Sequence, residues 1–495
     1  MKTQIAILFA HYIRKKNQNW IKNPIQQQNK TFNKLISKAK NTEFGRYHDF
    51  KQIKSYNDFK KNVPVRDYEG LKDYIDQVVN GQKNILWPGK PLYFAKTSGT
   101  TSGTKFIPIT RSSIKTHIRS ARDALLNYFL KSMNYKSING KHMFLQGSPE
   151  LIKKNGIYIG RLSGISAHYI PKLFLQNRMP SWETNCIKDW EEKVDKIIDE
   201  TIGERMTIIA GIPSWVQMYF EKIVQIKKKT ISEVFPELSL YVYGGVSYEP
   251  YKMMFEKLFG KNIDTLATFP ASEGFFGYQD EFTEKDPELL LLLNNDIFYE
   301  FIKTEDFLRG DKKRISLESV ELNVNYLLII STSAGLWAYN IGDTVKFTSL
   351  KPYRIIVTGR IKQFLSAFGE HVIAEEVEKA LKQTLNNTNV IVKEFTVAPK
   401  INPKEGLPHH EWYMDFENAP NNINDFSTEL DKKMRKLNIY YDDLVAGGII
   451  KPLIIKRIKS DDFKNYMRSA GKLGGQNKVP RLSNDRKIVD QLTLY

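Results

Sequence analysis

The sequence predicts an α/β protein, in which a large N-terminal domain of helix-covered β-sheets is followed by a small, mobile α+β C-terminal domain. Short apolar runs typical of buried strands alternate with apolar patterns at helical spacing as far as residue 360. After Gly359-Arg360 the pattern changes to a helix, short strands, a charged helix and a glycine-rich tail. We therefore expect two domains, residues 1–360 and 361–495, as suits a chain of 495 residues.

The N-terminal region is expected to be helical. The apolar run Ile5–Ala10 is six residues long, shorter than the ~7–15 residues of a signal-peptide core, and the basic residues 14–16 follow it. We interpret it as the start of an amphipathic helix. A second helix is predicted from apolar residues at helical spacing between Phe32 and Ala39, and Gly45 is expected to end it.

The later elements follow from the same two periodicities. A helix is expected around residues 215–223 and another over residues 373–385. The expected strands of both domains are Pro91–Ala95, Met206–Ala210, Leu240–Tyr243, Thr265–Phe269, Tyr326–Ile330, Val390–Val392, Glu394–Val397 and Glu411–Phe416.

Cysteine usage and hydropathy exclude several classes of protein. Cys186 is the single cysteine, so an intrachain disulfide framework and a CxxC metal or redox motif are both excluded. We expect it to be a buried structural thiol in a cytoplasmic protein. The longest later apolar run, Leu289–Leu293, is far shorter than the ~18 residues of a membrane span.

The net charge of +19 comes from 74 Lys and Arg against 55 Asp and Glu. It raises nucleic acid or an anionic membrane surface as a partner. However, the basic residues form short scattered runs, and no nucleic-acid-binding motif accompanies them. We therefore favour a solvated cationic surface and expect neither partner, with the chain a monomer or weak dimer, although polyanion binding stays open as an alternative of a different class.

A Ser/Thr/Gly-rich segment, Lys96–Lys105, follows the strand expected at Pro91–Ala95. Its glycines free backbone N–H groups to face an anion, its hydroxyls can donate to phosphate oxygens, and Lys105 supplies a positive charge. It is not a Walker A loop, because only three residues separate Gly99 from Gly103 and no Gly-Lys-Ser/Thr ending follows. Taken alone, the segment is better interpreted as an ordinary polar turn.

Three further segments share the chemistry of nucleotide binding. Gly244-Gly245 follows a strand, and paired glycines can admit a flat base against the backbone. Glu273 offers a hard oxygen ligand suited to Mg²⁺. Asp343 can accept from ribose hydroxyls, while Arg360 can pair with ribose or phosphate oxygens. Each is a common turn by itself, but their order and spacing together are specific.

These segments resemble a known superfamily. The string Thr97–Lys105 is similar to the phosphate-binding signature of adenylate-forming enzymes, which include acyl-CoA synthetases, nonribosomal adenylation domains and luciferases. Within it, Thr104–Pro108, Phe269–Gly277 and Gly475–Arg481 resemble the Gretchen Hagen three family of acyl-acid amido synthetases. The resemblance extends from about residue 30 to the C-terminus, and a departure from the plant pattern within residues 359–372 indicates a bacterial member and argues against plant-hormone substrates.

The resemblance implies ATP and Mg²⁺ as cofactors. It implies that one group of side chains contacts the phosphates, a second frames adenine near the turn that holds Mg²⁺ through Glu273, and a third binds ribose. In that order these residues are Thr97, Ser98, Gly99, Thr100, Thr101 and Lys105, then Gly244, Gly245, Phe269, Ser272 and Glu273, and finally Asp343 and Arg360. Lys478, after a glycine-rich stretch, matches the lysine that the family's C-terminal domain delivers to the carboxylate and α-phosphate, although a solvated tail lysine is the alternative.

The implied reaction joins a small carboxylic acid to an amine such as an amino acid, through an acyl adenylate, with Lys478, Glu273 and Lys105 as catalytic residues. The closest alternative is transfer of the same acyl group to coenzyme A or another thiol. His371 could act as the base for the amine, although the sequence favours a surface or helix-start histidine at this position. Candidate acyl-acid contacts, by position only, are His117, Tyr169, Phe275 and Phe276.

Overall fold

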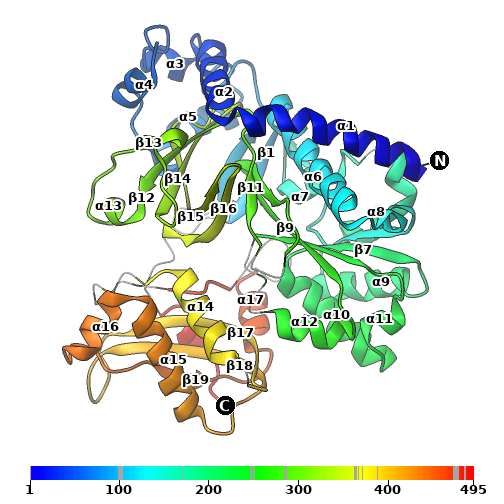
Figure 1. Ribbon diagram of the computed structural model, residues 1–495, viewed down its shortest axis with the longest axis vertical. Helices are drawn as coiled ribbons and strands as arrows, with labels where there is room; N and C mark the ends of the chain where they lie inside the picture. The colour runs from blue at the N-terminus through cyan, green and yellow to red at the C-terminus, as the bar shows by residue number, and fades with distance from the viewer. Residues whose placement is uncertain are drawn as a thin grey trace. The chain divides into compact units, whose positions relative to one another are not determined.

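The computed structural model describes residues 2–98, 104–170, 172–245, 248, 251–283, 287–361, 365, 367–368, 370, 372–386, 388–471, 479–483 and 486–495. The chain divides into two compact units, whose elements are labelled in Figure 1. The first unit comprises Met1–Ile212, Ser232–Gly245 and Ile263–Val357. The second comprises Pro213–Ile231, Val246–Asn262 and Thr358–Tyr495.

A long mixed sheet forms the centre of the first unit. Within the described residues it has twelve strands in the order β13-β12-β14-β15-β16-β11-β10-β9-β8-β7-β3-β6. Strands β8 and β9 pair in parallel, whereas β9 and β10 pair antiparallel. The strands are β3 Lys141–Phe144, β6 Arg178–Met179, β7 Met206–Ala210, β8 Leu240–Gly244, β9 Asp264–Ala271, β10 Gly274–Gln279, β11 Leu289–Leu291, β12 Ile297–Lys303, β13 Ile315–Ser316, β14 Asn325–Thr332, β15 Tyr339–Leu350 and β16 Tyr353–Arg360.

A smaller sheet in the same unit has the order β2-β1-β5-β4. It is built on an antiparallel hairpin of β1 and β2, beside which β5 runs parallel to β1. Its strands are β1 Tyr93–Ser98, β2 Thr104–Ile109, β4 Ile152–Lys154 and β5 Ile157–Gly160. The strands expected around residues 91–95, 206–210, 240–243, 265–269 and 326–330 are therefore all present.

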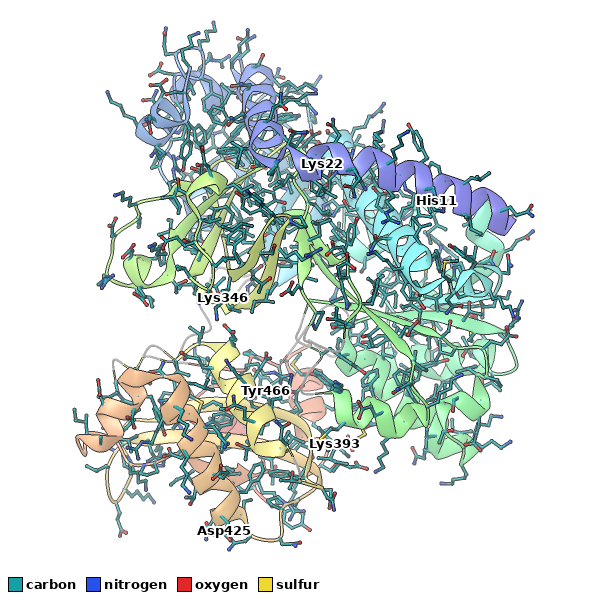
Figure 2. The ribbon with its side chains drawn as sticks, in the orientation of Figure 1. His11, Lys22, Lys346, Lys393, Asp425 and Tyr466 are labelled. Atoms are coloured by element: carbon teal, nitrogen blue, oxygen red, sulfur yellow. The ribbon has the colours of Figure 1, made fainter. Side chains whose placement is uncertain are left out.

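Helices cover these sheets, and α1 lies along α6 (Figure 1). The contact buries Ala10 and Ile13 of α1 against Leu126 of α6, as expected for an amphipathic N-terminal helix, which ends at Lys22 (Figure 2). The helices are α1 Lys2–Lys22, α2 Pro24–Ala39, α3 Glu43–Tyr47, α4 Tyr56–Asn62, α5 Tyr68–Val79, α6 Arg111–Ser132, α7 Leu162–Ala167, α8 Trp182–Cys186, α9 Trp190–Thr201, α11 Ile231–Val234 and α13 Thr304–Leu308.

The prediction that Gly45 ends the second helix is wrong. Helix α2 already ends at Ala39, and Gly45 lies inside the separate short helix α3. The new helix starts because the Thr42 hydroxyl accepts a hydrogen bond from the Gly45 N–H at 3.0 Å, which is a typical N-cap. A Cβ atom at Gly45 would lie 2.1 Å from the Ala39 carbonyl oxygen, so the glycine is required by close packing.

The second unit contains a three-stranded sheet in the order β17-β18-β19. One face packs against α14 and α15 (Figure 1), and the other packs against α17 and the C-terminal tail. Residues 390–392 and 394–397, expected as two strands, lie almost entirely in the single strand β17, whose register against β18 shifts at Val392. The elements are α10 Pro213–Lys227, α12 Lys252–Phe259, α14 Ala374–Leu385, β17 Ile391–Lys400, β18 His409–Asn418, α15 Ile423–Leu437, α16 Ile439–Ala446, β19 Ile454–Arg457 and α17 Asp462–Ser469.

Candidate active site

The β1–β2 hairpin carries the ends of the predicted phosphate-binding segment. Thr97 on β1 and Lys105 on β2 are directly paired across the hairpin. The Lys105 ammonium lies 5.4 Å from the centre of the Tyr68 ring, within the range of a cation–π contact. Gly99, Thr100 and Thr101 lie outside the described residues, as does the side chain of Ser98.

Tyr68 is a neighbour of this segment that the sequence did not reveal. It begins α5, and its hydroxyl accepts a hydrogen bond from the Phe106 N–H at 3.0 Å. Burial raises the pKa of the Tyr68 phenol, so the ring remains neutral beside the Lys105 ammonium. The contact places the Lys105 ammonium beside the Tyr68 ring at the base of the hairpin.

Tyr169, a predicted acyl-acid contact, also touches the hairpin. Its hydroxyl lies 3.0 Å from that of Tyr93 on β1, and the two rings meet edge to face. Burial and this hydrogen bond raise the pKa of the Tyr169 phenol. The Tyr169 phenol therefore stays protonated beside the strand that leads to Thr97, where its hydroxyl could donate to a substrate oxygen.

The predicted adenine segment begins at the end of β8. Gly244 pairs with Thr268 of β9, and a Cβ atom at Gly244 would lie 2.6 Å from the Thr268 carbonyl oxygen. Gly245 has a φ of +82°, which only glycine adopts without strain. Close packing against β9 therefore requires glycine at position 244, and the backbone conformation favours glycine at position 245, where the chain leaves the sheet.

The turn between β9 and β10 presents Ser272 and Glu273, both half-buried. Phe269, which precedes the turn, is buried, and its ring lies 5.0 Å from that of Phe276. Phe275 is also buried, and Phe276 is fully enclosed. This arrangement fixes the turn on a rigid aromatic base, and at Phe276 the packing resembles core more than a substrate contact.

Asp343 lies in an irregular stretch of β15. The register against β14 shifts between Leu327 and Ile329, and Gly342, with a φ of +86°, donates its N–H to the Asn340 side chain at 2.8 Å. Such a bulge redirects a side chain out of the regular alternation. Asp343 retains 9% exposure. Arg360, its predicted partner on ribose, ends β16, is exposed, and belongs to the second unit.

His117 is buried in the middle of α6, with 4% exposure. Burial lowers the pKa of its imidazole to about 4, so the ring is neutral at physiological pH. Its Nε2 atom has no hydrogen-bond partner among the described residues. His371 and Lys478, the two remaining catalytic candidates, lie outside those residues.

Few side chains of the described residues are grouped so that they could bind a metal ion. In the described part of the chain, no group of three or more His, Cys, Asp or Glu side chains could hold a metal ion. Mg²⁺ in nucleotide sites commonly uses one or two carboxylates with phosphate oxygens and water. A single carboxylate such as Glu273 therefore fits Mg²⁺ brought with a nucleotide.

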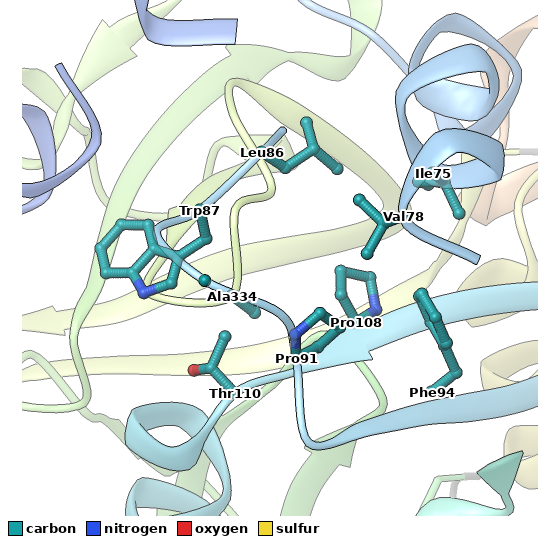
Figure 3. Close-up of a pocket in the computed structure, with 10 residues that line it drawn as sticks. Ile75, Val78, Leu86, Trp87, Pro91, Phe94, Pro108, Thr110 and Ala334 are labelled. Atoms are coloured by element: carbon teal, nitrogen blue, oxygen red, sulfur yellow. The ribbon is translucent and has the colours of Figure 1, made fainter. Parts of the chain in front are cut away.

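A small apolar hollow lies between α5, the start of the hairpin and the chain near Ala334 (Figure 3). Ile75, Val78 and Phe94 line it, and Thr110 contributes a hydroxyl that donates to the Ser333 carbonyl at 2.9 Å. It contains none of the predicted nucleotide-binding residues. We interpret it as a packing defect of the core.

Cys186 at the end of α8 is of intermediate exposure, so the expectation of a buried thiol is wrong. Burial is nevertheless sufficient to raise the pKa of the thiol, which makes it a poor nucleophile. Over the described residues, no helix combines the length and the apolar character needed to cross a membrane.

Comparison with known proteins gives matches along most of the chain. Family models match in three stretches: the GH3 family N-terminal domain over residues 14–184, the GH3 family central domain over residues 290–360, and the GH3 family C-terminal domain over residues 375–487. The indole-3-acetic acid-amido synthetase GH3.15 of Arabidopsis thaliana is 36% identical, in an alignment covering 92% of this chain and 90% of that protein.

Solved structures share the fold. In the structural comparison, the GH3.15 acyl acid amido synthetase superposes with a TM-score of 0.81 over 97% of this chain and 96% of that chain. The sequence identity in that structural match is 17%. A 2-hydroxyisobutyryl-CoA ligase, solved with an acyl-AMP in its postadenylation state, superposes with a TM-score of 0.62 at 12% identity, over 93% and 89% of the two chains. The α/β fold, with its large sheet domain and smaller C-terminal domain, is thus confirmed.

Proposed function

This chain belongs to the GH3 family, and we propose that it is an ATP-dependent acyl-acid amido synthetase. It is a ligase that activates a carboxylic acid as an acyl adenylate and transfers the acyl group to an amine, for which an amino acid is our first choice. The observation that carries this proposal is the sequence match to a named amido synthetase over 92% of the chain.

The first half-reaction makes the carboxylate a competent acyl donor. A carboxylate oxygen attacks the α-phosphorus of ATP, the bond from that phosphorus to the bridging oxygen breaks, and pyrophosphate leaves. Negative charge spreads over the phosphates in the transition state, so catalysis is mainly positioning and charge neutralisation. Lys105, held by Tyr68, and Thr97 stand at the hairpin from which phosphate contacts are expected.

The remaining roles are assigned by position. The edge formed by Gly244 and Gly245 would receive adenine, and Asp343 with Arg360 would hold the ribose. Lys478 would contact the reacting carboxylate and the α-phosphate. Glu273 would hold Mg²⁺, which when bound neutralises phosphate charge.

In the second half-reaction the amine nitrogen attacks the adenylate carbonyl carbon. The carbon–oxygen bond to AMP breaks, and the nitrogen loses a proton. His371 is our candidate for accepting that proton, because an imidazole titrates near neutral pH. We place the enzyme in the cytoplasm as a monomer or weak dimer that needs no nucleic acid.

Thioester formation is the alternative, because an acyl-CoA ligase shares this fold. The amide branch is favoured by the sequence relative, which is named an amido synthetase. Binding of a polyanion to the cationic surface is a further alternative, and it predicts steep salt dependence without ATP turnover.

Two assays on the purified chain test the proposal. ATP–pyrophosphate exchange is measured with a panel of aryl and aliphatic carboxylic acids, and AMP release is then measured with the active acid plus either amino acids or coenzyme A. We expect exchange with at least one acid, and AMP release that amino acids accelerate and coenzyme A does not. Acceleration by coenzyme A alone would favour the thioester alternative, and absence of exchange with every acid would contradict the proposal.

A further inference from the structure

Arg481 in the C-terminal tail has an unusually complete set of partners. Its guanidinium pairs with the carboxylates of Glu378 on α14, at 3.3 Å, and of Glu394 on β17. It also donates to the Phe395 carbonyl at 3.1 Å and to the Tyr251 hydroxyl at 3.0 Å. With 7% exposure it is among the few buried arginines of the described chain. All these residues belong to the second unit.

The site is shaped for a guanidinium rather than an ammonium. The Arg481 guanidinium carbon lies 4.6 Å from the centre of the Phe395 ring and 5.7 Å from that of Tyr251. A planar guanidinium offers five donors in a fixed fork and can stack on rings while it pairs with carboxylates. Lysine would keep the charge but could not make the same set of contacts.

The backbone around Arg481 is fixed as well. The Val397 N–H donates to the Arg481 carbonyl at 3.0 Å, and the Ser483 N–H donates to the Val397 carbonyl at 2.9 Å. Leu482, between them, forms a parallel bridge with Val397 and is buried in the core of the unit. The tail is therefore added to β17 in one register, with Arg481 as its side-chain anchor.

This anchor lies close in sequence to the lysine assigned to adenylation. Lys478 precedes Arg481 by three residues, and three residues of extended chain span at most about 11 Å. Fixing Arg481 therefore limits where Lys478 can be delivered. We propose that Arg481 is a positioning residue for adenylation, which acts through Lys478 by anchoring the tail to β17 and α14. This inference rests on the proposed function.

Arg486 offers a matched control in the same tail. It too pairs with a carboxylate, Glu411 at 2.9 Å, donates to the Tyr413 hydroxyl at 2.8 Å and donates to the Pro399 carbonyl at 3.0 Å. It follows Lys478 by eight residues, so its contacts constrain the position of Lys478 far less. Arg486 is half-buried rather than buried, but a general need for a carboxylate-paired arginine in the tail would make the two positions behave alike.

The test compares Arg481→Lys with Arg486→Lys in the full chain. For Arg481→Lys we expect ATP–pyrophosphate exchange to fall about tenfold or more in kcat, with amide formation from a presynthesised acyl adenylate within about threefold of the parent. Arg486→Lys should leave both half-reactions within about threefold. In a Lys478→Ala background, Arg481→Lys should cause no further loss of exchange, because Arg481 acts on adenylation through the Lys478 side chain.

Three results would overturn the inference: equal loss of both half-reactions in Arg481→Lys, equal effects of the two arginine variants, or full additivity with Lys478→Ala. If Arg481→Lys does not fold, Glu378→Gln removes one of its carboxylate partners and should lower exchange selectively in the same way. If the parent chain shows no exchange with any acid, the proposed function itself is refuted. If the parent chain is active and Arg481→Lys leaves its exchange rate unchanged, only this inference is refuted.

Discussion

Asp415 should make the second unit more stable in mildly acidic solution than at neutral pH. This side chain on β18 is 5% exposed, and burial raises its pKa from 3.8 to about 6. The Lys393 ammonium and a hydrogen bond from the Asp461 backbone oppose the shift, while the charges of Asp461 and Glu221 add to it. Lys393, labelled in Figure 2, is itself shared with Glu417 at 3.2 Å.

The sign follows from which form the folded state prefers. A folded-state pKa above the unfolded value means that the protonated carboxyl is favoured by folding. Its contribution is therefore complete below about pH 3.8 and is lost as the pH rises through about 6. A shift from 3.8 to about 6 corresponds to about 3 kcal/mol, which we reduce to about 1–2 kcal/mol because Lys393 and water screen the charge.

Asp415→Asn removes the charge and keeps an oxygen for the Asp461 N–H. We expect the variant to melt roughly 2–4 °C above the parent at pH 7.5, and at the same temperature as the parent at pH 4. Thermal unfolding followed from pH 4 to pH 8 measures both. Asp425→Asn on α15 is the control, because that exposed carboxylate stands in the first turn of its helix and its loss should slightly destabilise at neutral pH. A stabilisation of Asp415→Asn that persists at pH 4, or none at pH 7.5, would refute the reasoning.

Two further variants test the candidate active site. Gly244→Ala brings a Cβ atom to 2.6 Å from a backbone carbonyl of β9, so we expect the variant to lose about 1–3 kcal/mol of stability. We also expect a raised KM for ATP in exchange kinetics. A KM equal to that of the parent would show that adenine does not contact this edge. Lys478→Ala should suppress ATP–pyrophosphate exchange while amide formation from a presynthesised acyl adenylate persists, and equal loss of both would contradict the assignment.

Much of the strand framework could be predicted from the sequence. Met206–Ala210 is a mostly apolar run of strand-favouring residues between Arg205 and Gly211, so its strand is found with the same bounds. The C-terminal strand was predicted in two pieces, because the bulge near Val392 interrupts its alternation. The helix end expected at Gly45 failed for a local reason, since capping by Thr42 starts a new helix there and glycine serves close packing.

The candidate site was predictable only where its residues are neighbours in sequence. The pairing of Thr97 with Lys105 follows from a short hairpin. Tyr68 lies on a helix and contacts Phe106, which follows it by 38 residues. The periodicity of the sequence does not predict such a contact. Arg481 belongs to a recognisable string, but its hydrogen-bond partner Tyr251 lies 230 residues earlier.

The second unit is assembled from three stretches of chain, and this has a consequence for synthesis on the ribosome. Tyr251 meets Glu394 across 143 residues, and Lys257 meets Glu417 across 160 residues, so neither contact can form until most of the chain has been made. Contacts between distant residues also slow folding. Because these partners are hydroxyl, ammonium and carboxylate groups, water can form hydrogen bonds with them until the later residues have been synthesised. The nascent chain therefore delays this assembly without exposing, at these points, the apolar surface that promotes aggregation.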